Sequence, residues 1–172
     1  MNHHSRHAVP AVSDTVTQRS AEDRPVIFTR CINHPGSFYE CLLQWHRLKK
    51  PPETDVVPAL TRTAVHAHAV IDETGTRSSP PRRTKLIRRA GRTYLVFCGI
   101  ATESCVLKSA ADAFEHGYAP WIVADALASG VGPDIHDAGL VVACGLIGTG
   151  QLVTAENVVG QLTACAGAPV LE

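Results

Sequence analysis

The residue of this chain best placed to do chemistry is Cys105, which lies in the run YLVFCGIATESCVLKSAADAFEHG from Tyr94 to Gly117. A cysteine thiolate is a strong nucleophile. The first turn of a helix favours the thiolate, because unpaired N–H groups and a partial positive charge gather there. The same N–H groups can bind an oxyanion that forms on a substrate carbonyl. A buried structural cysteine is the competing interpretation, since free cysteines are among the most buried residues.

Two elements must position Cys105: a strand before it and a helix after it. The run Leu95–Cys98 is apolar without alternation, which is typical of a central parallel strand. Thr102 or Ser104 can cap the following helix, whose apolar residues recur every three or four positions as far as Gly117. The pattern therefore predicts Cys105 in the first turn of that helix.

The segment that carries Cys105 resembles a known family signature. The run GIATESCVLKSAADAFEHGY, followed by WIVADALAS, is similar to the signature of the isochorismatase-like cysteine hydrolases. That family includes nicotinamidases, carbamoylsarcosine amidases, ureidoacrylate amidohydrolases and biuret hydrolases. Weaker similarity extends from Arg24 to the C-terminus. The resemblance implies an α/β fold with a Rossmann-like three-layer α/β/α architecture and a mainly parallel sheet, in keeping with the alternation of predicted strands and helices.

The resemblance also implies a mechanism. Cys105 would attack the carbonyl of a small amide, carbamoyl or ureide substrate and form a thioester acyl-enzyme, which water then hydrolyses. The backbone N–H groups of Ala101 and Cys105 would form the oxyanion hole. A non-proline cis peptide bond is implied between Ile100 and Ala101.

The strand predicted over Arg24–Arg30 leads into a loop rich in turn-forming residues. Open α/β sheets bind ligands beyond the carboxyl ends of their strands, and the resemblance places substrate-facing residues in this loop. His34, Phe38 and Tyr39 are therefore candidates for the substrate pocket. Nicotinamidase-like relatives carry a metal-binding aspartate where this chain has Cys31, so we expect neither a metal nor a cofactor.

The resemblance fails at two catalytic positions. Family members end the next strand, predicted here over Val65–Ile71, with a lysine, but this chain has Asp72 and Glu73 there. The nearest lysine, Lys85, follows a segment with the composition of a loop. Family chains also begin with a strand that ends in an aspartate general base, and no such strand is evident here. General acid–base assistance is typically worth about 10²–10⁴-fold in rate.

Two functions from different classes therefore stay open. The first is a cysteine hydrolase that cleaves a C–N bond through Cys105. The alternative is a catalytically impaired or truncated family member that acts as a non-enzymatic binding or assembly subunit.

The chain has 172 residues, of which 45% are apolar, enough for the core of one domain. We expect residues 1–23 to form a flexible N-terminal arm and residues 24–172 to form the isochorismatase-like hydrolase domain. Three further helices are predicted, over Leu42–Leu48, Pro133–Gly145 and Ala155–Ala164. The apolar face of the helix over Pro133–Gly145 contains Ala138, Val141, Val142 and Leu146, and its His136 is expected to be exposed.

Charge and composition indicate a small-molecule substrate as partner. Sixteen basic and sixteen acidic residues leave no net charge, so neither a nucleic acid nor a membrane is expected. A basic run between Arg82 and Arg92 could bind an anion, although a solvated helix face is commoner. No secretory signal is evident and the six cysteines are scattered, which favours reduced thiols and a cytoplasmic location. The resemblance implies a homo-oligomer, a dimer or a tetramer.

Overall fold

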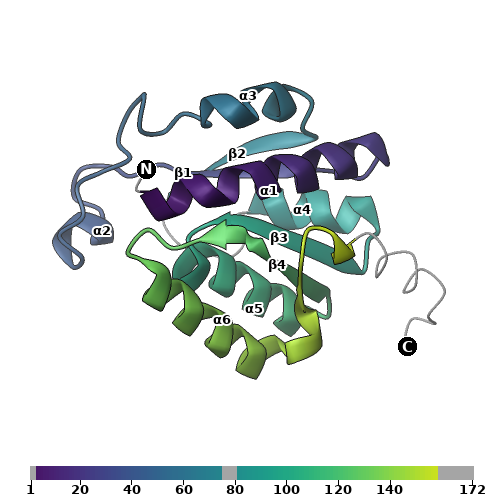
Figure 1. The fold of residues 1–172 in the computed structure, drawn as a ribbon. Coiled ribbons are helices and arrows are strands. Elements are labelled where there is room, and N and C mark those ends of the chain that lie inside the picture. The colour runs from purple at the N-terminus through teal and green to yellow at the C-terminus, as the bar shows by residue number, and fades with distance from the viewer. Residues whose placement is uncertain (1–2, 75–80, 159–172) are drawn as a thin grey trace. The chain divides into compact units, whose positions relative to one another are not determined.

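The computed structural model describes residues 3–74 and 81–158, and Figure 1 labels their helices and strands. Contacts within the chain divide it into two compact units. The first unit comprises Met1–Thr15 and Thr93–Glu172, and the second comprises Val16–Arg92. Helix α1, His3–Ala21, begins in the first unit and ends in the second.

The first unit contains a parallel sheet with the strand order β3-β4-β5. Its strands are β3 (Tyr94–Ile100), β4 (Ala119–Ala128) and β5 (Leu152–Val153). The register of β3 against β4 changes between Phe97 and Gly99, so that Phe97 pairs with Ile122 but Gly99 pairs with Leu127. Gly99 has a φ of 121°, a conformation that side-chain-bearing residues rarely adopt. The strand is thus irregular just before the turn that carries Cys105.

The described residues after β3 in the first unit form the helical segments η1 (Thr102–Val106, a π-helical turn), α5 (Leu107–Glu115), α6 (Pro133–Ile147) and η2 (Thr149–Gln151). The helix predicted over Ala155–Ala164 extends beyond the described residues. Helices α5 and α6 lie side by side against the sheet, and both contact β4 (Figure 1). The apolar core between these elements consists of Val106, Ala110, Ile122, Leu127, Ala143 and Ile147. Burial of these side chains is the main force that holds η1 and α6 against the sheet.

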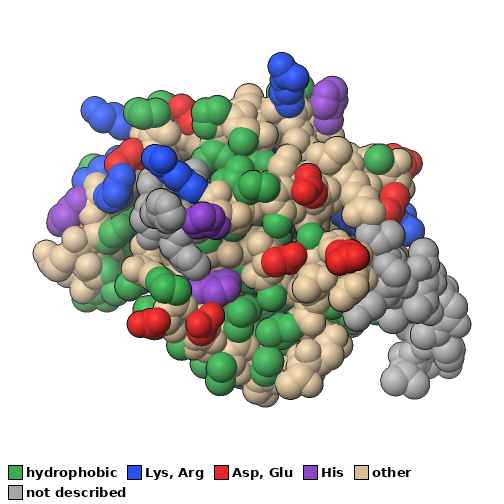
Figure 2. Space-filling model, in the orientation of Figure 1, with side chains coloured by type: hydrophobic (Ala, Val, Ile, Leu, Met, Phe, Trp, Pro, Cys, Tyr) green, Lys and Arg blue, Asp and Glu red, His purple; other side chains and the backbone are tan. Residues whose placement is uncertain are grey.

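The predicted apolar face of α6 is wrong. Hydrophobic side chains are visible over α6 on the surface (Figure 2), and Val141, Val142 and Leu146 are all exposed. The residues of α6 that are buried are Gly139, Ala143 and Ile147, which recur every fourth position. Apolar residues cover more than one face of this helix, so the sequence pattern alone did not distinguish the face that contacts the core.

The second unit contains a two-stranded parallel sheet of β1 (Ile27–Cys31) and β2 (Ala69–Glu73), in which Ile27 lies opposite Ala69. Its short helices are α2 (Phe38–Cys41), α3 (Pro58–Val65) and α4 (Pro81–Ala90). The second predicted strand begins four residues later than expected, because α3 extends to Val65.

The helix predicted over Leu42–Leu48 is also displaced. Helix α2 ends at Cys41, before that range begins. The reason is local: the Ser37 Oγ accepts a hydrogen bond from the Glu40 N–H, which starts the helical turn at Phe38.

Residues 3–21 are helical, whereas we expected a flexible arm over residues 1–23. Helix α1 covers most of this segment, and Ala8, Val12, Thr15 and Val16 are buried along it. These residues recur at intervals of three and four, the spacing of one helix face. The pattern was hidden because Pro10 interrupts it and the buried residues are small or polar. Among the described residues, no helix has both the length and the apolar character needed to cross a membrane.

Candidate active site

Cys105 lies in a short turn, Ile100–Val106, which we call the nucleophile turn after the role predicted for this cysteine. Strand β3 ends at Ile100, and the peptide bond between Ile100 and Ala101 is cis. The Ala101 carbonyl accepts hydrogen bonds from the N–H groups of Ser104, at 3.1 Å, and Val106, at 3.2 Å. Cys105 is partly exposed, and its Sγ lies 3.7 Å from the Ser104 Oγ. A partly exposed thiol at a helix start, beyond the end of a parallel strand, can reach a substrate carbonyl.

Cys98 provides a contrast within the same strand. Burial raises the pKa of the Cys98 thiol to about 11, because the surrounding protein disfavours the charged thiolate. At neutral pH this thiol is therefore almost entirely protonated and unreactive. Of the two cysteines in this segment, Cys105 is the one placed for nucleophilic chemistry.

Thr102 lies within the nucleophile turn, and its hydroxyl contacts helix α6. The Thr102 side chain is buried, with 2% of its surface exposed, and its Oγ1 lies 2.7 Å from the Nδ1 of His136. We expected Thr102 or Ser104 to cap the helix, but Ala101 is the N-cap and makes no side-chain cap bond. We also expected His136 to be exposed, whereas it is half-buried and bonded to the turn.

Glu103 connects the turn to the segment between β4 and α6. The Ser129 Oγ–H donates to the Glu103 Oε1 over 2.9 Å. The same Ser129 oxygen accepts the N–H groups of Val131, at 2.9 Å, and Gly132, at 3.2 Å. Ser129 is fully buried, so these bonds lie away from solvent. Thr102 thus bonds the nucleophile turn to His136 in the first turn of α6, and Glu103 bonds it to Ser129 just before that helix.

Gly139 allows α6 to approach the turn closely. A Cβ atom at this position would lie 3.2 Å from the Glu103 Cα, the Glu103 N and the Thr102 Cγ2. A larger residue would therefore push against the backbone of the turn. The sequence analysis did not predict that these contacts belong to the site. The residues that make them are Thr102, Glu103, Ser129, His136 and Gly139.

The three pocket candidates lie in the second unit, in the loop that follows β1. His34 is exposed, Phe38 is 80% exposed, and the Tyr39 ring packs at a centroid distance of 5.4 Å from that of Trp45. Their role in substrate binding stays a prediction.

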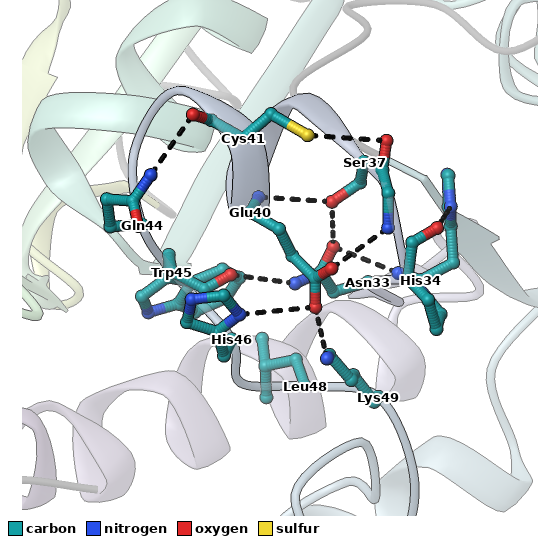
Figure 3. Close-up of polar contacts among 12 residues, drawn as sticks. Asn33, His34, Ser37, Glu40, Cys41, Gln44, Trp45, His46, Leu48 and Lys49 are labelled. Atoms are coloured by element: carbon teal, nitrogen blue, oxygen red, sulfur yellow. Dashed lines mark hydrogen bonds and ion pairs between the residues drawn. The ribbon is translucent and has the colours of Figure 1, made fainter.

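Figure 3 shows that this loop is held together by polar side chains. The buried Asn33 donates from Nδ2 to the Trp45 carbonyl and accepts hydrogen bonds at Oδ1 from the Ser37 hydroxyl and the His34 N–H. Glu40 pairs with Lys49 and His46, and it accepts the Gly36 N–H. Its bond with Lys49, followed by its bond with the Gly36 N–H, lowers the pKa of Glu40 to about 2.

Asp72 and Glu73, which stand where the resemblance implies a lysine, are both ion-paired. Asp72 pairs with Arg30 at 2.7 Å, and Glu73 pairs with Arg83 at 2.8 Å. Burial raises the pKa of Glu73, although the Arg83 charge partly opposes this effect. Lys85 lies on α4 with its side chain exposed.

The described residues that precede β1 form α1 and no strand, so this part of the chain shows no counterpart to the strand that carries the family's general base. Throughout residues 3–74 and 81–158, no group of three or more histidine, cysteine or acidic side chains is arranged to hold a metal ion.

Comparison with known proteins identifies the family. Residues 1–149 match the model of the isochorismatase domain, and the chain therefore belongs to the isochorismatase family. The match includes the segment that we expected to be an arm outside the domain. No curated protein matches the sequence.

Solved structures with the same fold include several hydrolases. N-carbamoylsarcosine amidase from Thermoplasma acidophilum is 17% identical, with a TM-score of 0.74 over 91% of this chain and 87% of that chain. Pyrazinamidase/nicotinamidase from Streptococcus mutans is 18% identical, with a TM-score of 0.73 over 88% of this chain and 87% of that chain. A cysteine hydrolase from Pseudomonas syringae is 19% identical, with a TM-score of 0.76 over 94% of this chain and 83% of that chain. These matches confirm the predicted three-layer α/β class.

Proposed function

We propose that this chain is a cysteine hydrolase that cleaves the C–N bond of a small amide, carbamoyl or ureide through Cys105. The observation that carries the proposal is the placement of Cys105 in a π-helical turn directly after the end of β3. The N–H groups of Ala101 and Cys105 belong to the same turn as the thiol, where an oxyanion would form.

The proposed reaction has two stages. The Cys105 sulfur attacks the substrate carbonyl carbon, the C–N bond breaks, and the thiol proton leaves with the amine or ammonia. A thioester then links the acyl group to Cys105. Water attacks the thioester carbonyl, its C–S bond breaks, and the products are a carboxylic or carbamic acid and the free thiol.

The substrate class rests on the family and on its named relatives. Structures with the same fold include an N-carbamoylsarcosine amidase and a nicotinamidase, which are named for substrates with a carbamoyl or carboxamide group. A cysteine nucleophile suits such substrates because a thioester is more easily hydrolysed than the amide it replaces.

A specific observation favours the alternative, a non-enzymatic binding or assembly subunit. The position of the family's lysine is occupied by Asp72 and Glu73, and both carboxylates are engaged with arginines. An enzyme of this kind would need another source of positive charge near the substrate.

Iodoacetamide alkylation decides between the two functions. The labelling of Cys105 is followed against pH by peptide mass spectrometry, with Cys144 as the internal control. We expect Cys105 to react faster than Cys144 below pH 8, and a Cys105→Ala variant to lose turnover in a panel of carboxamides, carbamoyl amino acids and ureides. Equal labelling of the two cysteines, with no turnover in the panel, would support the non-enzymatic alternative.

A further inference from the structure

We propose that His136 is a positioning residue for the nucleophile turn and that it acts through the hydroxyl of Thr102. This inference deepens the proposed function, on which its catalytic consequence rests. The imidazole does not contact the Cys105 sulfur in this account. It holds Thr102, a residue within the turn that presents the sulfur.

The first step of the argument is the burial of Thr102. Because only 2% of this residue is exposed, its hydroxyl cannot rely on solvent and must be satisfied by the protein. The Nδ1 of His136 lies 2.7 Å from it, a short hydrogen bond between residues 34 positions apart in sequence. Loss of the imidazole would leave a buried hydroxyl without this partner.

The second step is the rigidity of the element that carries His136. Helix α6 has 15 residues, and the His136 N–H donates to the Gly132 carbonyl within its first turn. One turn later, Gly139 brings the same helix against Thr102 and Glu103. The turn therefore contacts α6 both through a directional hydrogen bond and through close packing.

The third step connects Thr102 to the chemistry. Thr102 lies between Ala101 and Cys105, whose N–H groups are the proposed oxyanion donors. A rotation of Thr102 out of its site would move both donors relative to the sulfur. Misplacement of a reacting group by about 1 Å can reduce the rate about 10²-fold.

The test combines removal, rescue and matched controls. Thr102→Val keeps the shape of the side chain but removes the hydroxyl, and His136→Ala removes the imidazole. His136→Asn returns an amide close to the Nδ1 position, which can donate or accept a hydrogen bond. Thr149→Val and His116→Ala change exposed residues of the same unit and serve as controls.

Two measurements are made on the full chain: hydrogen exchange of the peptide over residues 100–106, and the alkylation rate of Cys105. We expect Thr102→Val and His136→Ala to speed exchange and slow alkylation, each about tenfold. His136→Asn should recover most of both losses. Combining Thr102→Val with His136→Ala should cost little more than either change alone, because they remove the same bond.

The proposal is overturned if His136→Ala exchanges like the His116→Ala control, or if His136→Asn behaves no better than His136→Ala. The proposed function can fail separately. If Cys105 of the wild-type chain is not selectively alkylated, the hydrolase is ruled out, while hydrogen exchange still decides whether His136 holds the turn.

Discussion

The hydroxyl of Ser129 donates to the Glu103 Oε1 over 2.9 Å while it accepts two backbone N–H groups from the segment that leads into α6. One buried oxygen thus joins the nucleophile turn to the start of that helix. The second oxygen of Glu103 is buried and has no hydrogen-bond partner within the described part of the chain. The bond from Ser129 therefore contributes more to the stability of this buried carboxylate.

We expect Ser129→Ala to lower the free energy of unfolding by about 2 kcal/mol, because the variant removes a charge-assisted bond and the acceptor of two buried N–H groups. Urea unfolding of the wild type and the variant measures this change. In a Glu103→Gln background the cost of Ser129→Ala should be smaller, since the charge on the acceptor is gone. An equal cost in both backgrounds would show that Glu103 does not contribute to it.

Two glycines of α6 give a matched pair. Nothing lies within 4 Å of a Cβ at Gly145, so Gly145→Ala should raise the free energy of unfolding by up to about 1 kcal/mol through helix propensity. Gly139→Ala should not give this gain, because its Cβ meets the nucleophile turn at 3.2 Å. It should also slow the alkylation of Cys105. If both variants are stabilised equally and label normally, the close approach of α6 has no effect on the site.

The pKa of Cys98 predicts a loss of stability at high pH. Because burial raises this pKa from 9.0 to about 11, the folded state disfavours the thiolate. The stability contributed by the neutral thiol is present below about pH 9 and is lost as the pH rises toward 11. Cys98→Ala should therefore flatten the decline of the unfolding free energy between pH 9 and pH 11. If the variant shows the same decline, groups other than Cys98 cause the loss of stability.

Glu40 predicts the opposite behaviour in acid. Its pKa is lowered from 4.5 to about 2, so its contribution is present above about pH 4.5 and is lost as the pH falls toward 2. Protection from hydrogen exchange, taken relative to the intrinsic exchange rate at each pH, should fall over residues 33–49 across this range in the wild type and change less in Glu40→Gln. Lys49→Met removes the largest cause of the shift, so the onset near pH 4.5 should stay the same while the total loss of protection becomes smaller. If Lys49→Met loses as much protection in acid as the wild type, this ion pair does not hold the loop.

The parts of the structure that could be predicted from sequence depend on contiguous residues. The strand, turn and helix around Cys105 follow from an apolar run, a glycine and a helical repeat within one short segment. The departures from the family pattern at the lysine and at the general base stay predictions from the resemblance.

The parts that could not be predicted depend on contacts between distant residues or on weak periodicity. Thr102 and His136 are far apart in sequence, and either side chain alone is consistent with a cap or a surface residue. Helix α1 contains Pro10 and buries small and polar side chains, so its pattern resembles that of an unstructured segment. Helix α6 is apolar on several faces, so tertiary packing and not the sequence pattern determines which face lies in the core.

The division of the chain has a consequence for its synthesis on the ribosome. The residues up to Thr15 cluster with residues from Thr93 onward, whereas the second unit is a continuous stretch. The second unit can therefore leave the ribosome complete while the first unit still lacks most of its chain. Contacts between such distant segments form slowly, because a long loop must close first. The turn that presents Cys105 belongs to the first unit, so it leaves the ribosome after the whole of the second unit.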